Sequence, residues 1–394
     1  MHYYVDHTSR FGQNTGIQCC VRAVARALMD VGTPLRPVVW SRQQADFDAA
    51  SPQALHHLAR WSGPAVEGWW TDEVRRPGSA EPHPTDRWLL IVELVSGPHS
   101  PTPRQLQRAA GRRGWQVAWV FHDAIPIRLA HLYGPGGAIT SAHHAAYMRG
   151  LALFPLVLAN SLTTAHHLRT FLQHEGLPWG HVRPLPLALE LLGTSPGKPP
   201  HQPTSHRPKR ILCVGSLEPR KNHRALLKAL VWLAAQDRCP AELVLVGWAN
   251  DPGVVAQVNR ASSLGVALQW QPQVDDQRLS ELYDWCDFTV YPSLEEGFGL
   301  PVAESLWKRR PCVCSGEGAL GELAAGGGCK SVNTSSWREL AAALEDLVHD
   351  SLLQHRLQVQ VQQRVLRSWR QYAQDLLQNL DQAESSTVRQ QAIV

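Results

Sequence analysis

Short, strongly hydrophobic runs alternate with longer amphipathic stretches along most of the 394 residues. The runs are rich in Val, Ile and Leu and too short for helices, so they predict β-strands, whereas the stretches between them have helical spacing. Strands that alternate with helices form βαβ units, whose sheets are mostly parallel and covered by helices on both faces. We therefore predict the α/β fold class. The expected strands lie at residues 1–5, 87–94, 116–122, 156–160, 181–185, 210–215, 242–247, 268–271, 288–292 and 311–314.

A proline- and glycine-rich stretch at residues 193–205 separates two such arrays of strands and helices. Proline lacks an N–H donor and glycine has high conformational entropy, so this stretch favours neither helix nor strand. A chain of this length is also long enough for two domains with separate cores. We predict domains over residues 1–192 and 210–366, a linker over 193–209 and a final helix over 367–385. A ligand cleft is expected between the domains, at the carboxyl ends of the strands.

Composition excludes several classes of protein. With 44% hydrophobic and 18% charged residues, the chain is expected to fold rather than remain disordered. No apolar run reaches the roughly 18 residues of a membrane-spanning helix, and the N-terminus has no signal-peptide core, so we expect a cytoplasmic protein. The eight cysteines include no CxxC pair and no zinc-finger spacing. We therefore expect neither a disulfide framework nor a metal site.

Positive charge is concentrated in the first half of the chain. The net charge is +4, but residues 101–150 contain six arginines and a single acidic residue, Asp123. Arg104, Arg108 and Arg112 recur every four positions and form a basic stripe if the segment is helical. Both a solvated helix face and a surface for anionic lipid headgroups or a phosphorylated acceptor fit this stripe. We expect no nucleic-acid partner, because no nucleic-acid-binding motif is present.

The most informative segment is YPSLEEGFGLPVAE, at residues 291–304. A strand is expected to end at its start, and Pro301 suits the first turn of a following helix. Between them, Gly297 and Gly299 let the backbone turn sharply and approach a ligand closely. The free amides at this helix start, around Phe298 and Leu300, and the helix dipole suit an anion such as a diphosphate.

Two carboxylates of this segment are candidates for binding hydroxyl groups. Glu296 precedes the predicted helix and Glu304 lies about one turn inside it. Side chains so placed cannot both face the same atom. One can accept hydrogen bonds from a sugar and the other from a ribose.

A second segment, VGSLEPRKN at residues 214–222, also leads from a strand end into a helix. Its adjacent cations, Arg220 and Lys221, can neutralise a leaving diphosphate as a metal ion would elsewhere. Taken alone, the segment favours a solvated loop between a strand and a helix over a binding site.

These segments together resemble a known enzyme family. Residues 296–304 match the E-x7-E motif of retaining glycosyltransferases with the GT-B fold, and the chain resembles their large fourth family, the group 1 glycosyltransferases. Arg220 and Lys221 match the diphosphate-binding pair of that family. Residues 270–276, WQPQVDD, resemble the stretch that meets the nucleotide base, which assigns Val274 to base binding. The resemblance implies two Rossmann-like domains and a final helix, containing Trp369, that crosses back to the first domain.

The first half of the chain resembles the family less closely. Asp6 with Gly16, and FHDAIP at residues 121–126, resemble motifs of the subgroup of O-antigen mannosyltransferases. This resemblance implies that the loop at Gly16 approaches the donor phosphates and that His122 lies near the reacting sugar and the acceptor. The alternative for His122 is a structural histidine bonded to backbone. The glycine-rich residues 316–328 depart from the family pattern, which leaves one wall of the donor site unassigned.

The resemblance implies transfer of a hexose, with retention, from a GDP- or UDP-sugar to a glycan or lipid-linked acceptor. Its subgroup suggests GDP-mannose and polysaccharide or O-antigen-type biosynthesis. Glu296 would orient the sugar, Glu304 would anchor the ribose, and Arg220, Lys221 and the amides of residues 298–300 would hold the leaving diphosphate. Glu296 is not assigned as a nucleophile, and no cofactor or essential metal is expected.

Two other functions fit the same architecture. A sugar-nucleotide epimerase would need a different set of acid and base residues. A non-catalytic nucleotide-sugar-binding protein would be expected to have lost Glu296, Arg220 or Lys221, which are all present. For the transferase, we expect a cytoplasmic protein that is either free or peripheral at the inner face of the cytoplasmic membrane.

Overall fold

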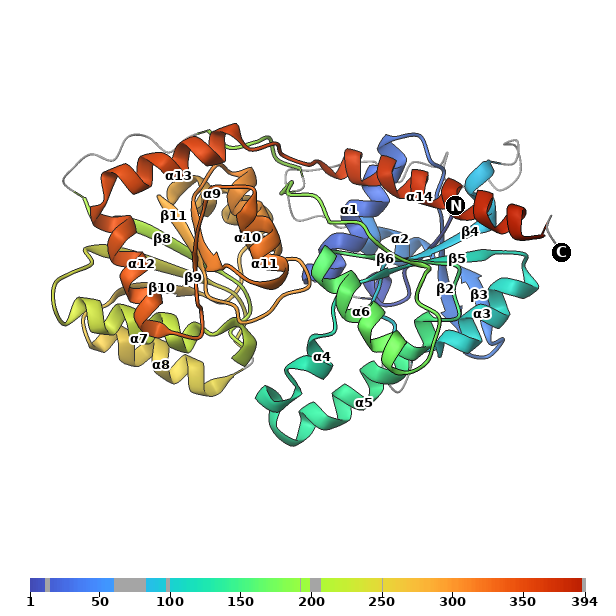
Figure 1. Ribbon diagram of the computed structural model, residues 1–394, viewed down its shortest axis with the longest axis horizontal. Helices are drawn as coiled ribbons and strands as arrows, with labels where there is room; N and C mark the ends of the chain where they lie inside the picture. Colours follow the sequence, from blue (N-terminus) through green and yellow to red (C-terminus); the bar gives the residue numbers. More distant parts are fainter. Residues whose placement is uncertain are drawn as a thin grey trace. The chain divides into compact units, whose positions relative to one another are not determined.

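The computed structural model describes residues 1–10, 15–59, 83–96, 100–191, 193–198, 207–249 and 251–391, which form two compact units. The first unit contains the chain up to Ala188 together with the residues from Ser368 on. The second runs from Leu189 to Arg367. Each unit is a sheet with helices on both faces (Figure 1), so the predicted α/β class is confirmed.

The first unit is built on a seven-stranded sheet with the order β3-β2-β1-β4-β5-β6-β7. All neighbouring strands are parallel except β3, which pairs antiparallel with β2. The strands are β1 (His2–Tyr4), β2 (Arg36–Ser41), β3 (Asp46–Ala49), β4 (Trp88–Ile91), β5 (Gln116–Phe121), β6 (Leu156–Ala159) and β7 (Val182–Pro184). The helices are α1 (Gly16–Asp30), α2 (Pro52–Ala59), α3 (Pro103–Arg112), α4 (Ile125–Arg128), α5 (Gly134–Leu151), α6 (Leu162–His174) and α14 (Trp369–Gln391).

The core of this unit explains why its central strands read as continuous hydrophobic runs. Every residue of β4 and of β6 is buried. A strand that has helices on both faces of its sheet has no solvent side, so polar residues do not alternate with apolar ones. Burial on both faces therefore made these strands predictable from composition.

The last helix of the chain packs on the first unit, as predicted. Figure 1 shows α14, in red, beside α1, in blue, and the two helices are in contact. Trp369 is 2% exposed. The indole of Trp88 donates a 2.8 Å hydrogen bond to Glu384, and Arg370 donates to the carbonyl of Asp30 at 3.0 Å. These long-range contacts hold α14 on the first unit.

The second unit is built on a six-stranded parallel sheet with the order β10-β9-β8-β11-β12-β13. The strands are β8 (Lys209–Val214), β9 (Ala241–Val246), β10 (Ala267–Gln271), β11 (Phe288–Tyr291), β12 (Cys312–Ser315) and β13 (Cys329–Val332). The helices are α7 (His223–Ala234), α8 (Pro252–Ser263), α9 (Asp276–Trp285), α10 (Leu300–Trp307), α11 (Gly318–Ala325), α12 (Trp337–His349) and α13 (Ser351–Gln363). The strand order reverses between β8 and β11, and ligands of open α/β sheets bind at such a switch point.

Three strands, β2, β3 and β13, were missed by the sequence analysis. Pro37 interrupts β2, β3 has the half-polar sequence DFDA, and β13 contains Lys330 and Ser331. β3 and β13 are edge strands, with one long side unpaired. Edge strands need neither continuous hydrophobicity nor strong β propensity, so their patterns are weak.

The predicted linker is in part bound to the second unit. The N–H of Gly197 donates to the carbonyl of Trp307 at 2.9 Å, and Arg310 donates to the carbonyl of Lys198 at 2.8 Å. The indole of Trp307 also donates to the Thr194 hydroxyl at 3.0 Å. The compact units accordingly divide after Ala188 rather than after residue 192, and residues 199–206 lie outside the described part of the chain.

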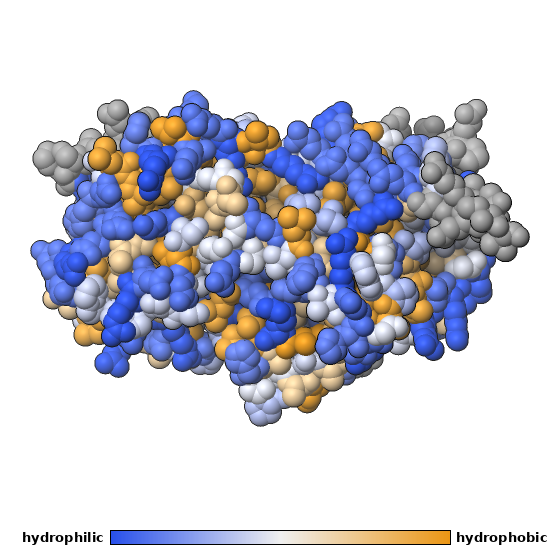
Figure 2. Space-filling model, in the orientation of Figure 1, coloured by the Kyte–Doolittle hydropathy of each residue, from blue (hydrophilic) through white to orange (hydrophobic). Residues whose placement is uncertain are grey.

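The surface of each unit is mixed in character. On the face drawn in Figure 2, polar residues cover most of the surface and hydrophobic residues form separate patches. Among the described residues, no helix has both the length and the hydrophobicity to cross a bilayer.

Candidate active site

Three of the predicted site residues of the second unit, Arg220, Lys221 and Glu296, gather at the switch point of its sheet. β8 and β11 are adjacent and parallel, so the loops that follow them emerge side by side. The first of these loops contains a 3₁₀ turn, Pro219–Lys221, and the second contains Glu296. Sequence-distant segments thus bring one carboxylate and two cations together.

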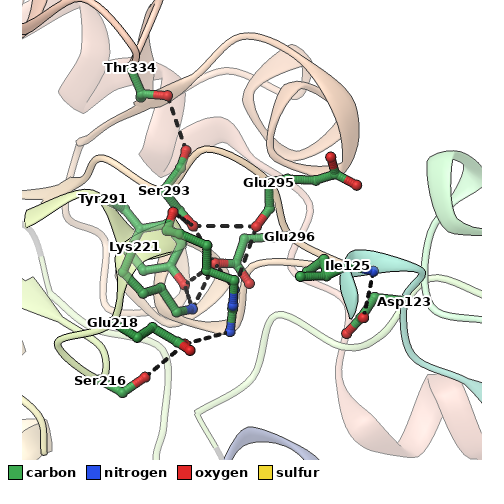
Figure 3. A network of polar contacts seen from close by, with 11 residues as sticks. Asp123, Ile125, Ser216, Glu218, Lys221, Tyr291, Ser293, Glu295, Glu296 and Thr334 are labelled. Atoms are coloured by element: carbon green, nitrogen blue, oxygen red, sulfur yellow. Dashed lines mark hydrogen bonds and ion pairs between the residues drawn. The ribbon is translucent and has the colours of Figure 1, made fainter. Parts of the chain in front are cut away.

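Four donors converge on the Oε1 atom of Glu296 (Figure 3). Arg220 Nη1 and Lys221 Nζ each lie 2.7 Å from it. The Ser293 hydroxyl donates to the same oxygen at 2.5 Å and the Tyr291 hydroxyl at 2.9 Å. The ammonium of Lys221 in turn donates to the Tyr291 hydroxyl and lies over its ring. None of the described residues donates to Oε2, so that oxygen can accept hydrogen bonds from a ligand.

The charges in this cluster determine the protonation state of Glu296. Burial by itself would raise the pKa of its carboxyl, but Lys221 and Arg220 outweigh that effect and bring the pKa to about 2. Burial lowers the pKa of Lys221, although the negative charge of Glu296 opposes this shift. At Arg220 the charges of Glu296 and Glu218 outweigh burial and raise the pKa. Glu296 is therefore an ionised hydrogen-bond acceptor over the whole physiological pH range.

Further contacts hold Arg220 in place. Glu218 lies 2.9 Å from Arg220 Nη2, and the hydroxyl of Ser216 donates to Glu218 at 3.0 Å. The N–H of Leu294 donates to the carbonyl of Arg220 at 2.8 Å, which joins the loop after β11 directly to the loop after β8. The two loops therefore form one hydrogen-bonded structure.

Thr334 extends this structure to the start of α12. Its hydroxyl donates to the carbonyl of Ser293 at 3.1 Å, and its own carbonyl accepts from the side chain of Asn222 at 2.6 Å. No role was predicted for Thr334, Ser293 or Tyr291. Ser293 and Tyr291 carried a local signal, since they are polar residues at a strand end beside Glu296, but nothing in the sequence pointed to Thr334.

The glycine-containing turn before α10 lies where the sequence analysis placed it. Gly297, Phe298 and Gly299 are buried and Leu300 begins the helix. Gly299 has φ +103°, and a Cβ added there would lie 2.4 Å from Cδ2 of Leu320. Glycine is therefore required at this position both by conformation and by packing.

Glu304 lies one turn inside α10, in a different environment from Glu296. Its Oε2 accepts a 2.8 Å hydrogen bond from the hydroxyl of Tyr283 on α9. Burial raises the pKa of Glu304 to about 7, although the Tyr283 hydroxyl opposes the shift, and Asp276 adds to it. The two carboxylates of the predicted motif thus have separate partners and pKa values on opposite sides of the ordinary one.

Val274 occupies the loop between β10 and α9. It is half-buried and packs against the cluster that includes Leu212, Val244 and Tyr283. The next residue, Asp275, caps α9 by accepting from the N–H of Arg278 at 2.7 Å. The loop that was expected to meet the base is therefore anchored to the sheet on one side and to α9 on the other.

The remaining predicted residues, His122 and Gly16, belong to the first unit. His122 is 6% exposed, and its Nε2 lies 2.5 Å from the carbonyl of Val92 while Nδ1 lies 2.9 Å from Asn160 Nδ2. A carbonyl only accepts, so the proton is on Nε2 and Nδ1 accepts from the amide. Burial lowers the pKa of His122, so the ring is neutral. Gly16 is exposed at the first residue of α1.

Within the described ranges, no group of three or more His, Cys, Asp or Glu side chains is arranged to hold a metal ion. None of the eight cysteines, all of which lie within the described ranges, forms a disulfide.

Residues 198–364 match the family described as glycosyl transferases group 1. The O-antigen chain mannosyltransferase B of Escherichia coli is 33% identical over 150 residues, which are 34% of this chain and 39% of the relative. A serotype-specific mannosyltransferase, WbdA of Escherichia coli, is 30% identical over 105 residues, 26% of this chain and 13% of the relative. The chain therefore spans about two fifths or less of the length of these relatives.

Solved structures similar over the whole chain have the same two-unit architecture. Sucrose-phosphate synthase of Thermosynechococcus elongatus has a TM-score of 0.66 at 15% identity, covering 98% of this chain and 99% of that protein. HepE of Anabaena, solved in complex with UDP and glucose, has a TM-score of 0.58 at 15% identity, covering 97% of this chain and 99% of that protein. At this identity, the similarity concerns the fold alone.

Proposed function

We propose that the protein is a retaining hexosyltransferase, because residues 198–364 match the group 1 glycosyl transferases and the chain has the GT-B fold. Its donor would be a nucleotide diphosphate sugar, with GDP-mannose favoured. Its acceptor would be a glycan or lipid-linked glycan of polysaccharide or O-antigen-type biosynthesis. The two mannosyltransferase relatives support the choice of sugar. The observation that carries the proposal is the convergence of Arg220 and Lys221 on Glu296 at the switch point.

The two cations are suited to stabilise a leaving diphosphate. As the bond between the anomeric carbon and the phosphate oxygen breaks, negative charge develops on the diphosphate, and preorganised donors lower the barrier most. An ammonium has three N–H donors and a guanidinium has five, so the bonds to Glu296 do not exhaust them. Lys221 and Arg220 can therefore remain paired with Glu296 and still bind phosphate oxygens.

Glu296 would orient the transferred sugar. With a pKa of about 2 it cannot supply a proton at neutral pH, and four donors already hold its Oε1. Its Oε2 can accept hydrogen bonds from sugar hydroxyls. A carboxylate held this firmly is a poor nucleophile, which supports front-face attack. In that reaction the acceptor oxygen bonds to the anomeric carbon as the phosphate leaves, and the acceptor proton passes to a phosphate oxygen.

The first unit would supply the acceptor side. Gly16 would let backbone approach the donor phosphates. Both ring nitrogens of His122 are engaged within its own unit, so its proposed contribution is to shape the site near the acceptor rather than to transfer a proton. No cofactor or essential metal is proposed, and unchanged transfer after treatment with a chelator is the expected result.

A contact with an anionic membrane surface is proposed for α3. Arg104, Arg108 and Arg112 are all exposed on this helix, and Arg112 also donates to the carbonyl of Ala45 at 2.8 Å. All three arginines of the predicted stripe are therefore exposed on one helix, although Arg112 also contacts Ala45 and Asp46 of its own unit. Binding to liposomes with anionic lipid that weakens with added salt would support a peripheral location at the inner face of the cytoplasmic membrane, and binding independent of both would refute it.

The deciding experiment is incubation of the purified protein with a panel of nucleotide sugars and glycan acceptors. Nucleotide release with formation of a new glycosidic bond of the donor's anomeric configuration is the expected result. Interconversion of the nucleotide sugar without release would indicate an epimerase. Binding without either reaction would indicate a non-catalytic protein. Unchanged transfer by the K221A variant would refute the assignment of the site.

A further inference from the structure

Tyr283 joins the helix that follows the predicted base-binding loop to the carboxylate proposed for the ribose. It lies on α9, and its ring is fully buried within a cluster that includes Leu212, Cys286 and Trp307. Its hydroxyl leaves this cluster and donates to Glu304 Oε2 at 2.8 Å. A phenol needs a polar partner when its ring is buried, and here that partner is Glu304.

The hydroxyl has a single proton and two acceptors within reach. The carbonyl of Pro301 lies 3.3 Å away, farther than Glu304. Hydrogen bonds to an ionised acceptor are stronger and shorter than those to a neutral carbonyl. The proton of Tyr283 therefore points to Glu304 when Glu304 is charged.

The main chain at Tyr283 is fixed as firmly as its ring. Its carbonyl accepts a 2.8 Å hydrogen bond from Arg310 Nε. Arg310 is 3% exposed, and it also donates to the carbonyl of Asp284 at 2.8 Å. Tyr283, whose hydroxyl donates to Glu304, is thus fixed both at its ring and at its main chain. It can therefore restrict the rotamers of the Glu304 side chain.

We propose that Tyr283 is a positioning residue for the donor: its hydroxyl holds the carboxylate of Glu304 in the orientation, and in the ionised form, that binds the ribose. The inference rests on the proposed function and adds to it a residue that touches no substrate itself. The ionised carboxylate can accept from both ribose hydroxyls, whereas a protonated carboxyl has one fewer site for them.

The charged and polar groups around Glu304 determine in which direction the affinity for the nucleotide sugar changes with pH. Burial and the neighbouring Asp276 of α9 raise the pKa of Glu304, and Tyr283 opposes them, with a result of about 7. Donor affinity should therefore fall as the pH falls through about 7. Loss of the Tyr283 hydroxyl removes the opposing contribution, so the pKa should rise and the loss of affinity should begin at a higher pH.

The test is a titration of the full chain with GDP, UDP and GDP-mannose by calorimetry between pH 5.5 and 9. For Y283F we expect a higher midpoint of the pH dependence and roughly fivefold weaker binding at pH 7, because a pKa raised by about one unit leaves about a tenth rather than half of the carboxyls ionised. Y372F, which removes a buried hydroxyl from α14 in the first unit, is the matched control and should bind as the wild type does. A Y283F midpoint and affinity equal to those of the wild type would overturn the proposal.

Two further variants separate a positioning role from a structural one. In an E304Q background, Y283F should cause no further loss of affinity, because it acts through a carboxylate that is no longer there; additive losses would overturn the proposal. E304D keeps the charge but shortens the side chain away from the hydroxyl, so it should raise the midpoint even if Y283F fails to fold, and an unchanged midpoint would again overturn it. Failure of the folded wild type to bind any nucleotide would instead refute the proposed function.

Discussion

Replacement of Glu296 by glutamine should destabilise the second unit by about 3 kcal/mol at pH 7. The pKa of Glu296 is about 2, against 4.5 for an ordinary glutamate. One pKa unit corresponds to about 1.4 kcal/mol, and the difference between folded and unfolded states is the contribution of the ionised group to stability, which gives about 3 kcal/mol here. The loss should be of this size because glutamine leaves Lys221 and Arg220 next to each other without the carboxylate that compensates them.

The pH dependence of this loss follows from the lowered pKa. A group whose pKa is lower in the folded state stabilises the protein above its unfolded value and loses that contribution as the pH falls through the folded value. The free energy of unfolding of the wild type should therefore exceed that of E296Q by the full difference at pH 5 and above. This difference in stability should disappear as the pH falls from 4.5 to about 2. Any contribution from Glu304, whose pKa is raised, is present in both proteins and cancels.

Urea denaturation followed by tryptophan fluorescence, repeated from pH 7 downwards, measures this difference. E295Q is the matched control, because it removes the same charge one residue earlier and Figure 3 shows its carboxylate turned away from the cluster around Glu296. We expect E295Q to remain within about 0.5 kcal/mol of the wild type. A difference between wild type and E296Q below about 1 kcal/mol at pH 7, or one that does not change with pH, would refute the reasoning.

Three other substitutions test separate parts of the structure. K221M removes one of the two cations proposed for the leaving diphosphate, and should lower kcat by roughly 10²- to 10³-fold in a transfer assay; a loss of less than threefold would contradict that role. G299A forces a Cβ to within 2.4 Å of Leu320 at φ +103°, so it should cost about 1–3 kcal/mol in chemical denaturation and weaken nucleotide binding; wild-type values for both would show that the turn relaxes freely. W369A removes a side chain that is 2% exposed, so it should cost the first unit about 3–5 kcal/mol, and an unchanged melting curve would argue against docking of α14.

Hydrophobic patterning was enough to predict the α/β class and the central strands. β4, β6 and β11 are buried throughout, and such strands are continuous apolar runs whatever their neighbours in the sheet. The patterning missed β3 and β13, because an edge strand is exposed along one side and its sequence is correspondingly unconstrained.

The candidate residues could also be chosen from the sequence, because their chemistry is local. Adjacent cations after a strand, and a glutamate before a Gly-x-Gly turn, are local patterns that make residues candidates, and the resemblance to a known family then selects among them. Arg220, Lys221 and Glu296 were selected in this way, and the structure brings all three together.

The partners of these residues were decided by the tertiary structure alone. Thr334 reaches Ser293 across 41 positions of the chain, and Tyr283 on α9 reaches Glu304 on α10 across 21 positions. Periodicity reports which face of an element is buried, but not which residue of another element it meets. The same distinction explains the two carboxylates. The spacing of Glu296 and Glu304 is given by the sequence. Their opposite pKa shifts depend on which cations and hydroxyls the fold places around each of them.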